Sequence, residues 1–219
     1  MTLEETERTA GETGWVPKCP ILLLVEGIDD KAFFEALIYH EYGAEVLQRI
    51  QVIILKDKTK WKCKLKIISG RAEFKDIVLS LGLVRDANGD PTAAFQSVYD
   101  ALNDNGLPVP ENPVVSVGNS PKVSVLILPK ENEPGELEDL CLESVKDDPA
   151  TPYVEQYFSD LNDAELSLPI KLCKPKVQVF LASRPRIISG FRVAAKAGCW
   201  PWDNEAFGPV KVFLQQIID

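Results

Sequence analysis

The chain is poor in histidine and in basic residues, and its cysteines are not paired in the manner of a zinc site. It has one histidine, and its 24 lysines and arginines stand against 33 acidic residues, which gives a formal charge of −9. Lysine and arginine drive most phosphate binding, so a protein that coats DNA or RNA with its whole surface is excluded. The five cysteines form no C-x-x-C pair. They are typical of reduced core residues, which predicts a cytoplasmic protein.

The sequence also lacks a targeting segment, a membrane span and the common catalytic motifs. It begins MTLEETERTAGETG, which is polar and acidic where a signal peptide has a basic start and an apolar run. No apolar stretch approaches the length of a transmembrane helix, so we expect no membrane association. There is no P-loop, no G-x-G-x-x-G and no serine–histidine pairing that favours a catalytic triad. We expect residues 1–18 to form a flexible acidic arm.

What the sequence does contain is an alternation of short apolar runs with helical stripes, which is typical of an α/β protein with a mainly parallel sheet and helices on both faces. We predict one domain over residues 19–219, with a core over about 20–146 and a C-terminal α/β extension over about 147–219. The expected strands are ILLLV (21–25), IQVIIL (50–55), KLKIIS (64–69), LGLV (81–84), VSVLIL (123–128) and VQVFLA (177–182). Helices are expected after Gly27, Gly70 and Pro91, and over 136–145, 151–163 and 207–217.

Acidic residues follow two of these strands. Glu26 comes directly after the first strand, and Asp30 lies in the first turn of the next helix. Asp86 closes a later strand, with Asn88 and Asp90 in the same loop. Because ligands of an open parallel sheet collect at the carboxyl ends of its strands, we expect these side chains to meet at one edge. Close carboxylates repel each other unless a cation joins them, and oxygen ligands favour Mg²⁺ or Mn²⁺ over zinc, which indicates a phosphoryl-transfer site.

The order of these motifs resembles the Toprim domain, whose pattern is a glutamate and a glycine at a strand end followed by a later Asp-x-Asp. The matching residues are VEG (25–27), Gly70 before a helix and DAN (86–88), and the resemblance covers about residues 20 to 130. It implies a Toprim-like fold for the predicted sheet.

Two further features resemble narrower groups within that superfamily. Asp30 and the LED of GELEDL (135–140) are similar to the OLD-type nuclease branch. The overall layout, including VRDANGDP (84–91) and PGELEDLCLESV (134–145), is most similar to a small family of uncharacterised stand-alone Toprim proteins. The resemblance therefore implies a nuclease-like protein.

By this resemblance Glu26, Asp30, Asp86 and Glu138 would hold one or two Mg²⁺ ions, and Glu26 would also act as an acid or base. OLD-type nucleases carry a lysine in their C-terminal part, which corresponds here to Lys196 in FRVAAKAGCW (191–200). A lysine there would neutralise charge that develops on the phosphate. The implied catalytic residues are Glu26, Asp86 and Lys196.

The chain departs from the Toprim pattern at Asn88, which stands where the second acid belongs. A neutral oxygen ligand removes one charge from the site and weakens its hold on a second metal, and Asp90 is the residue placed to compensate. Glu136 and Glu138 also have an ordinary interpretation, since acids in a helix's first turn complement its dipole.

One basic stripe interrupts the acidic sequence. Lys60, Lys62, Lys64 and Lys66 alternate with other residues, so a strand would display all four charges on one face. Such a stripe protects an edge strand from aggregation, or it contacts nucleic acid. The edge-strand interpretation is the more common of the two.

Two functional hypotheses follow from these patterns. The first is a Mg²⁺- or Mn²⁺-dependent enzyme that cleaves phosphodiester bonds in DNA or RNA with the strand-end acids. The second is a non-catalytic Toprim module that binds a protein partner or a nucleotide, as a homodimer or with a separate protein. Asn88 and the acidic balance favour the second, and the strand-end acids Glu26 and Asp86 favour the first.

Overall fold

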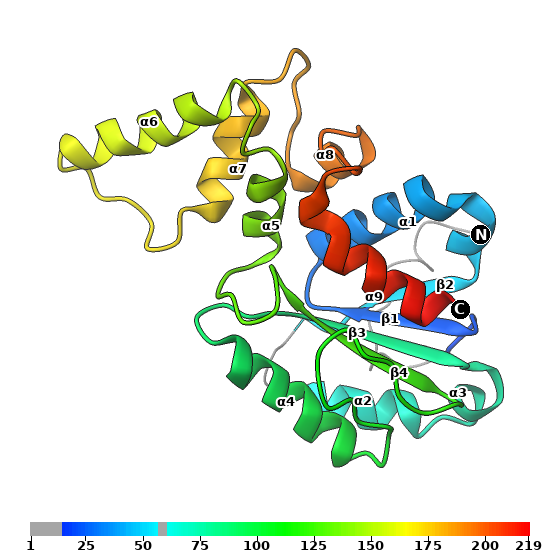
Figure 1. Ribbon diagram of the computed structural model, residues 1–219. Coiled ribbons are helices and arrows are strands. Elements are labelled where there is room, and N and C mark those ends of the chain that lie inside the picture. The colour runs from blue at the N-terminus through cyan, green and yellow to red at the C-terminus, as the bar shows by residue number, and fades with distance from the viewer. Residues whose placement is uncertain (1–14, 57–60) are drawn as a thin grey trace.

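The computed structural model describes residues 15–56 and 61–219 of the chain (Figure 1). Residues 1–14 of the predicted arm lie outside the described part. Trp15 is 5% exposed and belongs to the core, and the backbone N–H of Lys18 donates to Gln51 Oε1 at 2.8 Å. The chain is therefore folded from residue 15, four residues before the predicted start of the domain at residue 19.

Four parallel strands form the centre of the fold. They are β1 (Ile21–Val25), β2 (Ile50–Ile54), β3 (Ser80–Asp86) and β4 (Lys122–Leu128), in the spatial order β2-β1-β3-β4. The strands are apolar runs because both faces of the sheet are covered, as is usual for parallel sheets. The predicted strands at 21–25, 50–55, 81–84 and 123–128 are confirmed.

Two groups of helices cover the two faces of the sheet (Figure 1). One face packs against α2 (Trp61–Ser69), α3 (Ala72–Ile77) and α4 (Pro91–Asn103). The other packs against α1 (Ile28–Gln48) and α9 (Gly208–Ile218). The core of this layer continues away from the sheet into α5 (Leu137–Ser144), α7 (Cys173–Ala182), α8 (Phe191–Lys196) and the short 3-10 helix η3 (Glu205–Phe207). The remaining helix, α6 (Thr151–Asp163), packs beside α7 and projects from the body.

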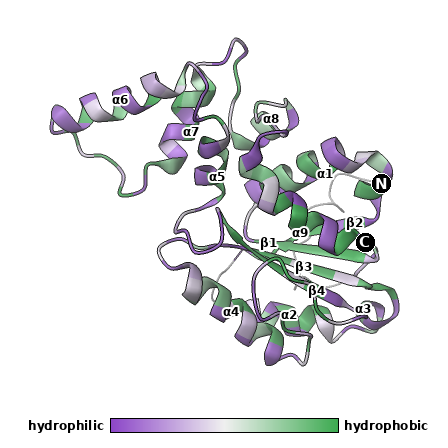
Figure 2. Ribbon diagram, in the orientation of Figure 1, coloured by the Kyte–Doolittle hydropathy of each residue, from purple (hydrophilic) through white to green (hydrophobic). Residues whose placement is uncertain are grey.

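Alternate residues of each strand serve the two layers. Leu23 of β1 belongs to the core under α1 and α9, whereas Leu22 and Leu24 belong to the core over α2 and α4. Figure 2 shows the strands mostly in the hydrophobic colour, whereas the helices carry both colours. The predicted α/β class, with a parallel sheet flanked by helices on both faces, is confirmed.

Gly82 in β3 sets how closely α9 approaches the sheet. A Cβ atom at this position would lie 2.9 Å from the ring of Phe213 and 3.1 Å from the side chain of Ile217. Both of these residues are buried and lie on α9. The missing side chain therefore leaves the space that α9 fills.

The predicted strand at 64–69 is wrong, because this segment lies in helix α2. Its alternating lysines fit a strand, but Trp61, Leu65 and Ile68 are four and three residues apart, and all three are buried on one face of a helix.

The predicted strand at 177–182 is also wrong, because it lies in α7, where Val177, Phe180 and Leu181 form the buried face. Residues 147–219 are all described, and their regular structure is helical, so the C-terminal extension is not α/β. Among the described residues, no helix is both long and apolar enough to span a bilayer.

Candidate functional site

Glu26 and Asp86 meet at the carboxyl edge of the sheet. Glu26 directly follows β1, Asp86 is the last residue of β3, and these two strands pair in parallel. The backbone N–H of Asp86 donates a hydrogen bond of 3.2 Å to Glu26 Oε1. Arg85 Nε lies 4.0 Å from the same oxygen. The Glu26 side chain is 9% exposed, so its charge is largely withdrawn from water.

Asp30 joins this pair from the first turn of α1. Its Oδ2 accepts a hydrogen bond of 3.0 Å from the backbone N–H of Gly27, and the residue is 8% exposed. Burial, followed by the nearby negative charges of Glu26 and Glu138, raises the pKa of Asp30 to about 7. The carboxyl group of Asp30 therefore lies close enough to those of Glu26 and Glu138 to be repelled by both.

Glu138 reaches the same edge from the first turn of α5. The backbone N–H of Leu137 donates to Asp86 Oδ1 at 3.2 Å, which ties the start of α5 to the end of β3. A second tie lies beside it, because Asn88 and Gly135 exchange backbone hydrogen bonds of 2.8 and 2.7 Å. Glu138 is 6% exposed, and burial raises its pKa against the opposing charge of Lys174.

The structure places four of the predicted metal ligands, Glu26, Asp30, Asp86 and Glu138, at one edge of the sheet, but no three of them have ligand atoms within 4.8 Å of one another. Their carboxyl groups come from the β1–α1 junction, the end of β3 and the start of α5. Carboxylate oxygens in this number are suited to a hard divalent cation such as Mg²⁺.

Asn88 and Asp90 are placed differently in the loop after β3. Asn88 has a left-handed backbone (φ 53°), which asparagine tolerates well, and its side-chain oxygen accepts from Lys171 Nζ at 2.9 Å. Asp90 is exposed and caps α4, where its Oδ1 accepts from the backbone N–H of Ala93 at 2.9 Å. The contact of Asp90 is thus with its own helix rather than with the four acids.

Sequence reasoning missed Lys171, Lys174 and the contacts of Glu136. Lys171 pairs with Glu136, and Lys174 Nζ lies 3.6 Å from Glu136 Oε2 and 3.3 Å from Glu138 Oε1. Burial lowers the pKa of Lys174, but the charge of Glu138 and its hydrogen bond to the ammonium outweigh this and raise it to about 12. Lys171 precedes α7 and Lys174 lies in its first turn, so no spacing along one helix marks this pair in the sequence.

Cys173 lies between these lysines in the sequence and is close to two of the acidic side chains. Its Sγ and one oxygen each of Glu136 and Glu138 all lie within 4.8 Å of one another. Burial and the charges of Asp139 and Glu136 raise the pKa of the Cys173 thiol to about 11. The thiol is therefore protonated at neutral pH, and a protonated sulfur is a poor ligand for a metal.

Lys196 lies in the last turn of α8 and lines a cleft of about 500 Å³. Glu138 and Lys174 line the same cleft, together with Asp29 and Arg192. The predicted lysine and one of the predicted metal ligands thus open onto one space, although no direct bond joins them.

The lysine stripe lies on the other face of the sheet. Lys62, Lys64 and Lys66 are in α2, which packs against α4, and Lys60 falls outside the described residues. Lys62 Nζ lies 2.5 Å from Asp104 Oδ2. Because residues of a helix do not alternate between two faces, these side chains neither guard a strand nor form one charged row. Both interpretations of the stripe assumed a strand, and that assumption is wrong.

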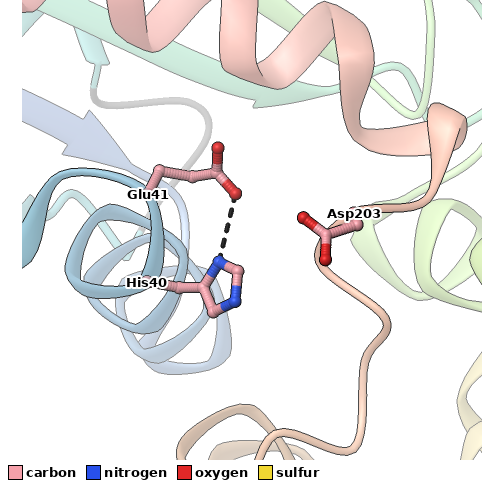
Figure 3. Close-up of side chains that lie close together, drawn as sticks. All are labelled: His40, Glu41 and Asp203. Carbon is pink, nitrogen blue, oxygen red and sulfur yellow. Dashed lines mark hydrogen bonds and ion pairs between the residues drawn. The ribbon is translucent and has the colours of Figure 1, made fainter.

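A second group of potential ligands lies farther along α1. His40, Glu41 and Asp203 have ligand atoms within 4.8 Å of one another, and Figure 3 shows the bond of 3.1 Å between His40 Nδ1 and Glu41 Oε1. Lys211 Nζ also lies 2.8 Å from Glu41 Oε1 and supplies a positive charge there. His40 is ten residues beyond Asp30, about 15 Å along the helix, so this group is separate from the four acids.

Comparison with known proteins places the chain in a family without assigning an activity. Neither the curated proteins nor the solved structures gave a match. One family matches residues 20–219, which include the whole sheet and the acidic edge, that is, Glu26, Asp30, Asp86 and Glu138. The chain belongs to this family, which is described as "Protein of unknown function (DUF3226)".

Proposed function

We propose that the chain is a divalent-cation-dependent phosphodiesterase that acts on nucleic acid. The observation that carries the proposal is the convergence of Glu26, Asp30, Asp86 and Glu138 at the carboxyl edge of a parallel sheet. This edge is where α/β proteins bind their ligands. The resemblance to Toprim domains, with its strand-end glutamate and later aspartate, supports the same activity.

The donor set fits a hard cation. All four groups offer carboxylate oxygens, which suit Mg²⁺ or Mn²⁺. A bound cation would also relieve the repulsion between neighbouring carboxylates. Glu26, Asp86 and Glu138 would hold the ion, with Asp30 behind Glu26. A bound divalent cation supplies charge neutralisation and Lewis-acid polarisation of a phosphoryl oxygen.

The chain's own residues have distinct tasks in this proposal. Asp86 holds α5 in place through the N–H of Leu137, and so it fixes the position of Glu138. We assign proton transfer to Glu26, which directly follows β1 and lies beside Asp86, the last residue of β3. Lys196 faces the cleft beside Glu138, where its ammonium can offset charge on a phosphate.

A cleavage assay tests the proposal. The purified chain is incubated with plasmid DNA, single-stranded DNA and RNA in Mg²⁺ or Mn²⁺, beside Glu26→Gln and a matched Glu45→Gln control on the exposed side of α1. We expect cleavage by the wild type and by Glu45→Gln, and a loss of about 100-fold or more in Glu26→Gln. Equal cleavage by Glu26→Gln, or no cleavage of any substrate, contradicts the proposal.

A second candidate is a non-catalytic module that binds a nucleotide or a protein. It is favoured by the contacts of Lys171 with Asn88 and Glu136, and of Lys174 with Glu136 and Glu138, because the chain's own cations then neutralise part of the acidic edge. Calorimetric titration with Mn²⁺ separates the candidates. Absent or weak uptake, unchanged by Asp86→Asn, supports the module, and tight uptake that Asp86→Asn abolishes supports the enzyme.

A further inference from the structure

A cleft of about 500 Å³ opens beside the four acids, between the C-terminal helices and the body of the protein. Its walls come from the starts of α1 and α5 and from α7 and α8, with the segment that precedes α8. Glu138 lines both the cleft and the acidic edge. A molecule in the cleft would therefore lie beside Glu138, one of the four acids.

Positive side chains gather on the C-terminal wall of this cleft. Lys174 of α7 and Arg192 and Lys196 of α8 line it, and all three are exposed. Arg192 Nε lies 3.7 Å from Asp29 Oδ1, and Lys174 Nζ lies 3.3 Å from Glu138 Oε1. Within the described residues, Lys196 makes no ion pair, so its charge remains available for an anion.

The wall also offers a small apolar surface between the cations. Val193 lines the cleft and is 43% exposed, and Gly190 lies just before α8 with a backbone that only glycine adopts readily (φ 154°, ψ 178°). A positively charged groove that follows the sugar-phosphate backbone is one of the means by which proteins hold an unpaired strand.

The size of the cleft selects between strand types. About 500 Å³ is the volume of a pocket for one small molecule, which suits a nucleotide or two of a single strand. The two paired strands of a duplex are too wide to enter a cleft of this volume. Its chemistry and its size therefore point to the same ligand.

We propose that this cleft binds single-stranded nucleic acid next to the phosphate to be cut, with Arg192 and Lys196 on the sugar-phosphate backbone. The inference rests on the proposed function, since it names the substrate class of that site. Lys174 and Glu138 both line the cleft and lie 3.3 Å apart, so this pair joins the strand-binding wall to the acids.

Fluorescence anisotropy tests the inference with the full chain in Ca²⁺. The probes are a short labelled single-stranded oligonucleotide and the same strand in a duplex. We expect the single strand to bind at least about tenfold more tightly than the duplex. In Arg192→Gln and Lys196→Gln its affinity should fall, and the dependence of log K on log salt should lessen by about 0.7 per lost phosphate contact. Lys75→Gln, an exposed position on α3, removes the same charge elsewhere and should leave binding unchanged.

Lys196→Arg should restore binding, which distinguishes a charge contact from a folding defect, and melting curves check that each variant is folded. Equal affinity for duplex, unchanged binding in both cleft variants, or no oligonucleotide binding at all would overturn the inference. These outcomes are independent of the cleavage assay. Cleavage that depends on Glu26 but not on Arg192 rejects the cleft alone, while strand binding without any cleavage rejects the enzyme alone.

Discussion

The carboxylate of Asp86 accepts a hydrogen bond of 3.2 Å from the backbone N–H of Leu137, the first residue of α5. This bond joins the last residue of β3 to the helix that carries Glu138. Asp86 and Leu137 are 51 residues apart in the sequence. One acid thus has two tasks, since it holds the site together and contributes its charge to the site.

Substitutions at Asp86 should separate these two tasks. Asp86→Asn keeps an oxygen that can accept from Leu137, whereas Asp86→Ala leaves that N–H without its partner. We expect Asp86→Ala to lower the free energy of unfolding by about 1–2 kcal/mol more than Asp86→Asn does, in urea denaturation without divalent cation. Both variants should lose Mn²⁺ uptake. Equal stability of the two variants would contradict the structural task, and Asp76→Ala on α3 is an exposed control.

The pKa of Asp30 predicts a pH dependence of stability. Its pKa is about 7 in the fold against an ordinary 3.8, so the folded state holds this proton more tightly than the unfolded chain does. The contribution to stability is therefore complete below pH 3.8, is lost as the pH rises to about 7, and stays lost above that. The loss is at most about 4 kcal/mol, because the shift is about three units.

Asp30→Asn should remove this dependence, because its amide stays neutral. Without divalent cation, the variant should be more stable than the wild type at about pH 8 and no more stable at about pH 4. Chemical denaturation across this pH range measures the difference. A wild-type stability that does not fall between these values, or falls equally in Asp30→Asn, counts against a close cluster of acids.

Lys174 should compete with a metal ion for Glu138. Its Nζ lies 3.3 Å from Glu138 Oε1, so removing the lysine charge leaves this carboxylate more attractive to a cation. We expect Lys174→Gln to bind Mn²⁺ about three- to tenfold more tightly in calorimetry. Lys176→Gln, whose lysine pairs with Glu155 at 2.6 Å, is the matched control on the same helix. Weaker binding in Lys174→Gln would show that this lysine supports the metal site rather than competing with it.

Gly82 offers a test of the fold that is independent of the site. Gly82→Ala places a Cβ atom 2.9 Å from Phe213, which is closer than such atoms normally lie. The buried side chains of Phe213 and Ile217 must move to make room, and we expect a loss of about 1–3 kcal/mol in the free energy of unfolding. Gly89→Ala, where a Cβ meets nothing within 4 Å, is the control. Comparable stability of the two variants would contradict the close packing of α9 on β3.

The sheet and three of the four acids, Glu26, Asp30 and Asp86, were predictable because the sequence carries local signals for them. Uniformly apolar runs identify buried parallel strands, and the ends of parallel strands share an edge, so Glu26 and Asp86 could be expected to lie together. Asp30 followed from its place one turn into the next helix. Glu138 came only from the resemblance, since nothing local shows that the Asn88–Gly135 bridge brings α5 to this edge.

The cationic side of the site could not be predicted in the same way. Lys171 and Lys174 reach Glu136 and Glu138 through contacts between segments about 35 residues apart, which no local pattern encodes. The short apolar run at 177–182 fits a strand and a buried helix equally well, and the strand was the wrong choice. The strand predicted from the alternating lysines at 62, 64 and 66 was wrong for the same reason. This segment is a helix, and Trp61, Leu65 and Ile68 are its buried residues.

The central claim is that Glu26 and Asp86 share one divalent cation, and anomalous diffraction from a crystal soaked in Mn²⁺ tests it most directly. We predict an anomalous peak between the two carboxylates, about 2.0–2.2 Å from their oxygens, with Glu138 close by. A crystal with no peak at this edge, or with its only peak at His40, Glu41 and Asp203, would contradict the claim.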